Sequence, residues 1–167
     1  MLNLKQSNAM LNKESLRRKN FKPDIFFAST TAKKLKINNE TDSQSILVCL
    51  MKTGDKLQEI RDKIDVTIIP SNIYRCELLN DAVGGSKNSW HMQGLAADIN
   101  ATGYTPLELQ EWLKNSGISV DKCLLERNCV HVQFNLDDSK NRNLFDGVVK
   151  IDGQWVLISN LPKKPNA

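Results

Sequence analysis

The most informative stretch of the chain is Ser89-Trp90-His91-Met92-Gln93-Gly94-Leu95-Ala96-Ala97-Asp98. It supplies one imidazole and one carboxylate, and the only other histidine of the chain, His131, follows close behind Glu126. A lone histidine is more often a packed or surface residue than a metal ligand. Two histidines and an aspartate, however, can hold zinc while a fourth position stays open to water, as catalytic zinc sites require. The stretch therefore favours a metal site.

Upstream of this stretch, the sequence predicts one long helix and one strand. Apolar residues recur at helical spacing between about 43 and 64 and would form a single buried stripe. Gly54 either weakens this helix or marks a bend in it. Residues 66–69 are β-branched throughout and should form a strand that Pro70 ends. Residues 1–20 are polar and basic, which indicates a flexible arm or a short helix.

Downstream, the sequence predicts a further strand, a capped helix and a terminal hairpin. The strand spans residues 95–99. The segment Thr105-Pro106-Leu107-Glu108 has the pattern of a capping box with proline in the first turn, and it opens a helix that ends near residues 115–117. Apolar alternation on both sides of Asp152-Gly153 indicates a β-hairpin over residues 148–158.

Another predicted hairpin, with strands at 122–126 and 129–134, fixes the position of Glu126. Side chains alternate between the faces of a strand. Because the apolar residues of the second strand should face the core, His131 faces the opposite side. With a two-residue turn, Glu126 pairs with Cys129 and Leu124 pairs with His131, and paired residues share a face. The hairpin therefore places a carboxylate beside the candidate metal site, with Cys129 at its rim.

The run from Ser89 to Asp98, together with Glu126 and His131, resembles the motif of the zinc D-Ala-D-Ala carboxypeptidase family. This family includes phage endolysins that cut peptidoglycan stem peptides, and it shares its fold with the Hedgehog signalling domain. The similarity covers roughly residues 20–135. Residues 69–75 are similar to the family's Ile-Ser-Gly-Tyr-Arg-Ser segment, and residues 79–89 to its Asn-x-x-Val-Gly-Gly-x-x-x-Ser segment.

The resemblance implies an α+β fold in which helices pack on one side of a small antiparallel or mixed sheet. It implies Zn²⁺ as the cofactor and hydrolysis of peptide bonds in peptidoglycan stem peptides as the activity. A carboxylate would act as general base, and an arginine would stabilise the oxyanion or a substrate carboxylate. The implied site residues are the metal ligands His91, Asp98 and His131, the catalytic residues Glu126 and Arg75, and the substrate-binding residues Ser89 and Tyr74.

Several of these residues also have simpler interpretations. Asp98 could be a turn residue at a strand end, Glu126 a solvated hairpin carboxylate and Arg75 a surface cation. Trp90 fits a packing residue and a substrate-groove aromatic equally well. A second function is therefore kept: a non-catalytic virion or cell-wall-binding protein on the same zinc fold. It draws on the altered flanks, Cys129 in place of an aromatic residue and Gln133 in place of serine, and on the additional C-terminal hairpin. The chain also departs from the family pattern at Asn72, which replaces a glycine, and in Glu126, which lies one residue nearer to the final histidine.

Length and composition indicate one ordinary domain. The 23 Lys and Arg residues exceed the 19 Asp and Glu residues by four, which fits an anionic polymer and a plain soluble protein equally well. The cations are scattered, so no nucleic-acid partner is expected. The four cysteines lack Cys-x-x-Cys spacing and should be free thiols, with Cys49 in the core, and Cys123 should face away from Cys129.

We expect three parts in the chain: a flexible arm at 1–20, a zinc peptidase domain at 21–138, and an extension with a β-hairpin at 139–167. No apolar run approaches the roughly 20 residues of a membrane span, and the N-terminus lacks the apolar core of a signal peptide. The expectation is therefore a monomer made in the cytoplasm that acts on the cell wall, for example as a phage protein released in the host.

Overall fold

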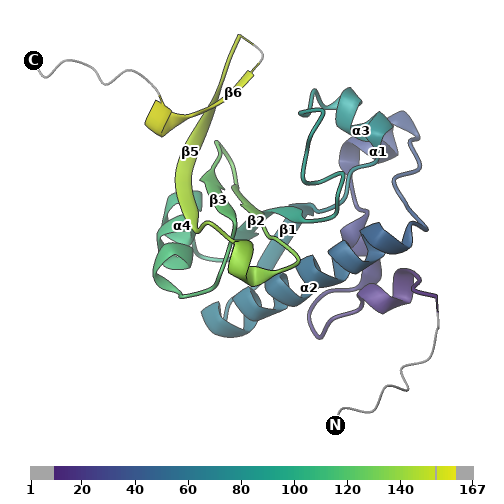
Figure 1. Cartoon of the computed structure of the whole chain (residues 1–167), viewed down its shortest axis with the longest axis horizontal. Coiled ribbons are helices and arrows are strands. Elements are labelled where there is room, and N and C mark those ends of the chain that lie inside the picture. Colours follow the sequence, from purple (N-terminus) through teal and green to yellow (C-terminus); the bar gives the residue numbers. More distant parts are fainter. Residues whose placement is uncertain (1–9, 153, 161–167) are drawn as a thin grey trace, which may run out of the picture.

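A computed structural model describes residues 10–152 and 154–160, and it shows an α+β fold built on one six-stranded mixed sheet (Figure 1). The strand order is β1-β2-β4-β3-β5-β6. Strand β5 runs parallel to β3, and every other neighbouring pair is antiparallel. The strands are β1 (Ile68–Asn72), β2 (Ala96–Ala101), β3 (Lys122–Leu125), β4 (Val130–Gln133), β5 (Leu144–Ile151) and β6 (Gln154–Leu157).

Four α-helices accompany the sheet: α1 (Thr30–Leu35), α2 (Gln44–Ile64), α3 (Glu77–Ala82) and α4 (Pro106–Asn115). Figure 1 shows α2 running beneath the sheet and the β5–β6 hairpin extending away from it. Helices α2 and α4 share one apolar core with the sheet, as the fold-class prediction expected. Among the described residues, no helix combines the length and the apolar character needed to cross a bilayer.

Helix α2 follows the predicted stripe, with Leu47, Leu50, Leu57, Ile60 and Ile64 buried. Gly54 marks a close contact instead of a bend, because a Cβ there would meet the Phe26 ring at 2.9 Å. Phe26 closes the short 3₁₀ helix η2 (Pro23–Phe26). The glycine thus lets the N-terminal segment pack directly on the long helix.

The predicted capping box at the start of α4 is confirmed. The Thr105 hydroxyl accepts from the Glu108 backbone N–H at 3.3 Å, and the Glu108 carboxylate accepts from the Thr105 backbone N–H at 2.8 Å. These two bonds satisfy donors that a helix start otherwise leaves free. Helix α4 then packs against β2, β3 and β4.

Strand alternation separates the core from the site. Ala97 and Ile99 of β2 and Val130 and Val132 of β4 are fully buried within the apolar core. Asp98 lies between the first two, so its side chain leaves the sheet on the opposite face. The sheet therefore carries the apolar core on one face and polar chemistry on the other.

Two local expectations need correction. Strand β1 was expected at 66–69 with Pro70 as its end, but it continues through Pro70 to Asn72. It pairs only with β2 at the sheet edge, where a missing N–H is tolerated, and a register irregularity follows the proline. Cys49 is only half-buried on α2, because it sits beside the apolar stripe and not in it.

The two ends of the predicted domain also contact the body of the protein. Within the predicted arm, residues 13–16 form the 3₁₀ helix η1 (Lys13–Leu16), and Leu16 is fully buried. Residues 1–9 lie outside the described residues. The predicted C-terminal hairpin is present as β5 and β6, although Gly153 of its predicted turn lies outside the described residues. Because β5 pairs with β3, the extension enlarges the sheet. The domain boundaries themselves stay a prediction.

Candidate metal centre

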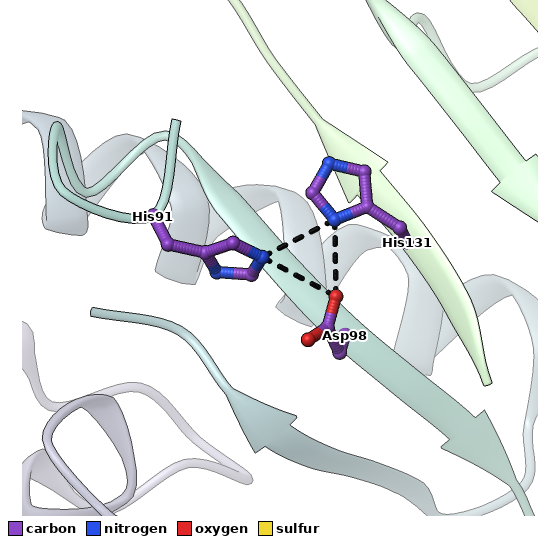
Figure 2. A group of neighbouring side chains, drawn as sticks. All are labelled: His91, Asp98 and His131. Atoms are coloured by element: carbon purple, nitrogen blue, oxygen red, sulfur yellow. Dashed lines mark hydrogen bonds and ion pairs between the residues drawn. The ribbon is translucent and has the colours of Figure 1, made fainter. Parts of the chain in front are cut away.

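The structure brings His91, Asp98 and His131 together on the open face of the sheet (Figure 2). Asp98 and His131 are directly opposed on the paired strands β2 and β4, and His91 comes from the segment between α3 and β2. His131 Nδ1 lies 3.0 Å from Asp98 Oδ1, and His91 Nε2 lies 3.3 Å from the same oxygen. The two ring nitrogens are 3.2 Å apart.

This triangle of atoms fits a small divalent cation. A tetrahedral zinc site with ligand bonds of about 2.0–2.1 Å has ligand–ligand edges of about 3.3–3.4 Å, close to the 3.0, 3.2 and 3.3 Å observed. The two imidazole nitrogens and the Asp98 oxygen face one another, and neutral rings cannot supply a proton to every one of these contacts. A metal ion bound between the three atoms would accept their lone pairs and remove this conflict. A group of three protein ligands leaves the fourth position for water or substrate.

Each ligand is oriented by a second hydrogen bond. His91 Nδ1 lies 3.1 Å from the carbonyl oxygen of Ile73, so the ring donates there and keeps Nε2 free as a ligand. His131 Nε2 lies 3.4 Å from Gln133 Oε1, which leaves Nδ1 free. Asn72 Nδ2 donates to Asp98 Oδ2 at 3.2 Å. Sequence reasoning had treated Asn72 and Gln133 only as departures from a family pattern, whereas both orient ligands.

Burial and charge shift the titration of this group. Burial opposes ionisation of Asp98, but the two imidazoles outweigh it and hold the pKa of the carboxyl well below its usual range. Burial lowers the pKa of His91. Burial acts the same way on His131, but its hydrogen bond to Asp98 prevails and raises the pKa of His131. Metal binding needs neutral imidazoles and an ionised carboxylate.

Glu126 lies where the hairpin register predicted it. Its backbone N–H donates to the Cys129 carbonyl at 3.0 Å, and Leu124 is paired with His131. A carboxylate oxygen of Glu126 lies within 4.8 Å of one from Asp98. Burial, and then the negative charge of Asp98, raise the pKa of Glu126. A carboxylate with a raised pKa beside a metal centre is suited to taking and returning a proton.

Cys129 lies beside this carboxylate, as predicted, and its Sγ donates to Glu126 Oε2 at 3.7 Å. Burial, with help from the charges of Asp98 and Glu126, raises the pKa of the Cys129 thiol to about 12. Cys129 thus lies at the rim of the site as a half-buried and weakly nucleophilic thiol. Cys123 is buried in the core, and both thiols are free.

Arg75 supplies the cation of the site. Its backbone N–H donates to the His91 carbonyl at 3.2 Å. Buried Asn39 fixes the flanking backbone by donating to the Tyr74 carbonyl at 2.9 Å and accepting from the Cys76 N–H at 2.8 Å. Among the described residues, Arg75 Nε is buried without a hydrogen-bond partner. The Arg75 side chain also lines the cleft and lies within the electrostatic reach of Asp98 and Glu126, so it places positive charge at this wall of the site.

The site opens into a cleft of about 340 Å³, within the usual range for small-ligand sites. Ser89 and Trp90 line it, together with Lys122, Leu124 and Val148 of β3 and β5. Tyr74, expected at the substrate, lies elsewhere: it is 6% exposed and packs edge-on against Phe27, with ring centroids 5.9 Å apart. The next residue, Arg75, lines the cleft, whereas Tyr74 belongs to the apolar core.

One cleft thus combines three convergent atoms that could hold a metal ion, an adjacent carboxylate with a raised pKa, and an arginine, which are groups that metal-dependent hydrolysis uses. Comparison with known families matches residues 19–133 to the family described as Peptidase M15. The chain therefore belongs to the peptidase M15 family, whose members are typically metal-dependent. A search of curated proteins finds no match.

Proposed function

We propose that this protein is a zinc peptidase that hydrolyses peptide bonds in peptidoglycan stem peptides. The observation that carries the proposal is the triangle of His91, Asp98 and His131 with Glu126 beside it, in a chain of the M15 family. We further propose that the protein acts on the cell wall, for example as a phage protein released in the host.

The reaction divides between the metal and the protein. Zinc, when bound by the two histidines and Asp98, supplies Lewis acidity that polarises a carbonyl and acidifies water. Glu126 accepts the proton of the attacking water and passes it to the amine that leaves. Positioned proton transfer of this kind contributes about 10²–10⁴-fold to a rate. Cys129 S–H, which donates to Glu126 Oε2, holds this carboxylate in place.

Arg75 and Lys122 favour a substrate that carries carboxylates. Both line the cleft, and within the described part of the chain neither side chain forms an ion pair. Peptidoglycan stem peptides carry a terminal carboxylate and acidic side groups, which suit this pair of cations.

Two measurements test the proposal. Zinc is quantified in untagged protein before and after chelation, and purified peptidoglycan is assayed for release of new amines, with mass spectrometry of the muropeptides identifying the bond. We expect about one equivalent of zinc, and amine release by the wild type that Glu126→Gln abolishes. Less than about a tenth of an equivalent after zinc supplementation contradicts the metal site. Zinc binding without any amine release would favour the non-catalytic cell-wall-binding alternative.

His131→Ala provides the matched test of the ligand set. A site with three protein ligands cannot spare one, so this variant should lose both zinc and activity while keeping its fold by circular dichroism. Retention of stoichiometric zinc with wild-type affinity would show that His131 is not a ligand.

A further inference from the structure

We propose that Arg142, Asp121 and Gln133 form a hydrogen-bonded chain that positions His131 for metal binding. Arg142 lies beyond residues 19–133, which match the M15 family, so a segment outside the matched region would help to set the metal affinity of the site. This inference rests on the proposed metal binding. The three residues act through His131 and are positioning residues.

The chain of contacts is continuous and charge-assisted. His131 Nε2 lies 3.4 Å from Gln133 Oε1, and Gln133 Nε2 donates to Asp121 Oδ2 at 2.7 Å. Arg142 donates two hydrogen bonds to the same carboxylate, from Nη2 to Oδ2 at 2.6 Å and from Nε to Oδ1 at 2.8 Å. Paired donors from one guanidinium fix a carboxylate in orientation as well as in charge.

The direction of these bonds decides the tautomer of His131. An ionised carboxylate only accepts hydrogen bonds, so Gln133 must turn its NH₂ group to Asp121 and its oxygen to His131. That oxygen, in turn, accepts only from a protonated Nε2. The proton of the neutral ring therefore stays on Nε2, and the lone pair stays on Nδ1, the atom that lies 3.0 Å from Asp98 Oδ1.

Asp121 is held in its accepting state by its surroundings. It is 1% exposed, and the hydrogen bonds from Arg142 outweigh its burial and lower its pKa to about 2. Its backbone N–H donates to the Gln133 carbonyl at 2.8 Å, and its carbonyl accepts from the Leu144 N–H at 3.1 Å. Both carboxylate oxygens of Asp121 accept hydrogen bonds from Gln133 or Arg142, and Asp121 is not among the residues that line the cleft.

The segment that carries Arg142 is itself anchored beside Asp121. Asn143 Oδ1 accepts from the Val120 N–H at 3.1 Å, and the Asn143 N–H donates to the Val120 carbonyl at 2.9 Å. Strand β5 begins directly afterwards and pairs with β3. The same extension places Val148 in the lining of the cleft. The extension therefore reaches the centre twice, once through Arg142 and once through the cleft wall.

The test measures the zinc dissociation constant by competition with a chromophoric chelator, together with the visible absorption spectrum of the cobalt-substituted protein. Four variants are compared with the wild type: Gln133→Met, Arg142→Ala, Arg142→Lys and the control Arg18→Ala. Gln133→Met keeps the side-chain volume but removes the acceptor of His131. Arg18 is a matched control because it also pairs with an aspartate, with Nε 2.5 Å from Asp55 Oδ1, far along the chain from the site.

Residues that orient a metal-ligating histidine typically contribute about 10–100-fold to metal affinity. We expect Gln133→Met to weaken zinc binding by about that factor and Arg142→Ala by about 10-fold, both with an altered cobalt spectrum. Arg142→Lys, which restores a donor to Asp121, should recover part of the loss. Arg18→Ala should lower thermal stability without changing the zinc dissociation constant or the cobalt spectrum. Such a result would show that a loss of stability alone does not weaken zinc binding.

Unchanged zinc constants, within about twofold, in both Gln133→Met and Arg142→Ala would overturn the inference while leaving the metal site intact. If Gln133→Met does not fold, Arg142→Ala decides alone, because that side chain is 55% exposed and its removal should leave the fold intact. Absence of zinc from the wild type would instead overturn the proposed function, and this inference with it.

Discussion

Glu126→Gln tests two properties of the Glu126 carboxylate: its electrostatic repulsion from Asp98 and its ability to accept a proton. Carboxylate oxygens of Glu126 and Asp98 lie within 4.8 Å of each other. At an effective dielectric constant of about 20, two unit charges about 4.8 Å apart repel by about 3.5 kcal/mol. Arg75 and His131 attract both carboxylates and offset part of this repulsion, and burial adds to the cost of the Glu126 charge.

The sign of the effect on stability follows from the raised pKa of Glu126. A carboxyl whose pKa is higher in the folded state destabilises that state once the pH exceeds its unfolded pKa. At pH 7 the metal-free Glu126→Gln variant should therefore be more stable than the wild type, by about 1 kcal/mol after the offset from Arg75 and His131. The same variant should lose at least about 10²-fold in the rate of amine release, because it cannot accept a proton.

Urea unfolding of the chelated proteins measures the first effect, and amine release from peptidoglycan measures the second. The matched control is Glu111→Gln, an exposed carboxylate on α4, which should change the unfolding free energy by less than about 0.5 kcal/mol and leave the rate unchanged. A variant at 126 that keeps its rate would refute the assignment of the base. A loss of about 1 kcal/mol or more in the metal-free variant would refute the charge-crowding argument.

Three further predictions concern the surroundings of the site. Gly94→Ala should lower the unfolding free energy by about 2–4 kcal/mol in urea titrations, because Gly94 has φ +74° and a Cβ there would meet Leu50 Cγ at 2.9 Å; a loss below about 0.5 kcal/mol would contradict this packing. The pKa of Asp121 is lowered from 3.8 to about 2 by Arg142, so its contribution to stability is present above pH 4 and is lost as the pH falls towards 2. Acid unfolding of metal-free wild type should therefore show a drop over this range, on the order of 2 kcal/mol, that is missing from Asp121→Asn, and parallel curves would refute it. Cys129→Ser keeps a donor to Glu126 and should retain zinc, with a rate within about threefold of the wild type; metal analysis showing lost zinc would make Cys129 a ligand and the site a closed, structural one.

Much of the chemistry was readable in the sequence because it depends on local periodicity. The twofold alternation of a strand places Asp98 and His131 opposite the apolar residues beside them, and the two-residue turn sets the register that brings Glu126 to the same face. The capping box at Thr105 is also a local pattern, and it holds in the structure. The candidate ligand group was recognisable because its residue types and their order lie in two short segments, and the structure brings these three side chains together.

Tertiary structure decided what depends on contacts between distant segments. Whether Pro70 ends a strand depends on whether that strand lies at a sheet edge, and strand order is set by long-range pairing. Tyr74 and Arg75 are neighbours in sequence, yet Phe27 and the apolar core hold the first while the second faces the cleft. Asp121 meets Gln133 because β3 pairs with β4, and Arg142 joins them from the segment that leads into β5, which pairs with β3. Residue type alone gives no signal for such a contact, because its free energy exists only once the chain has folded and excluded water from it.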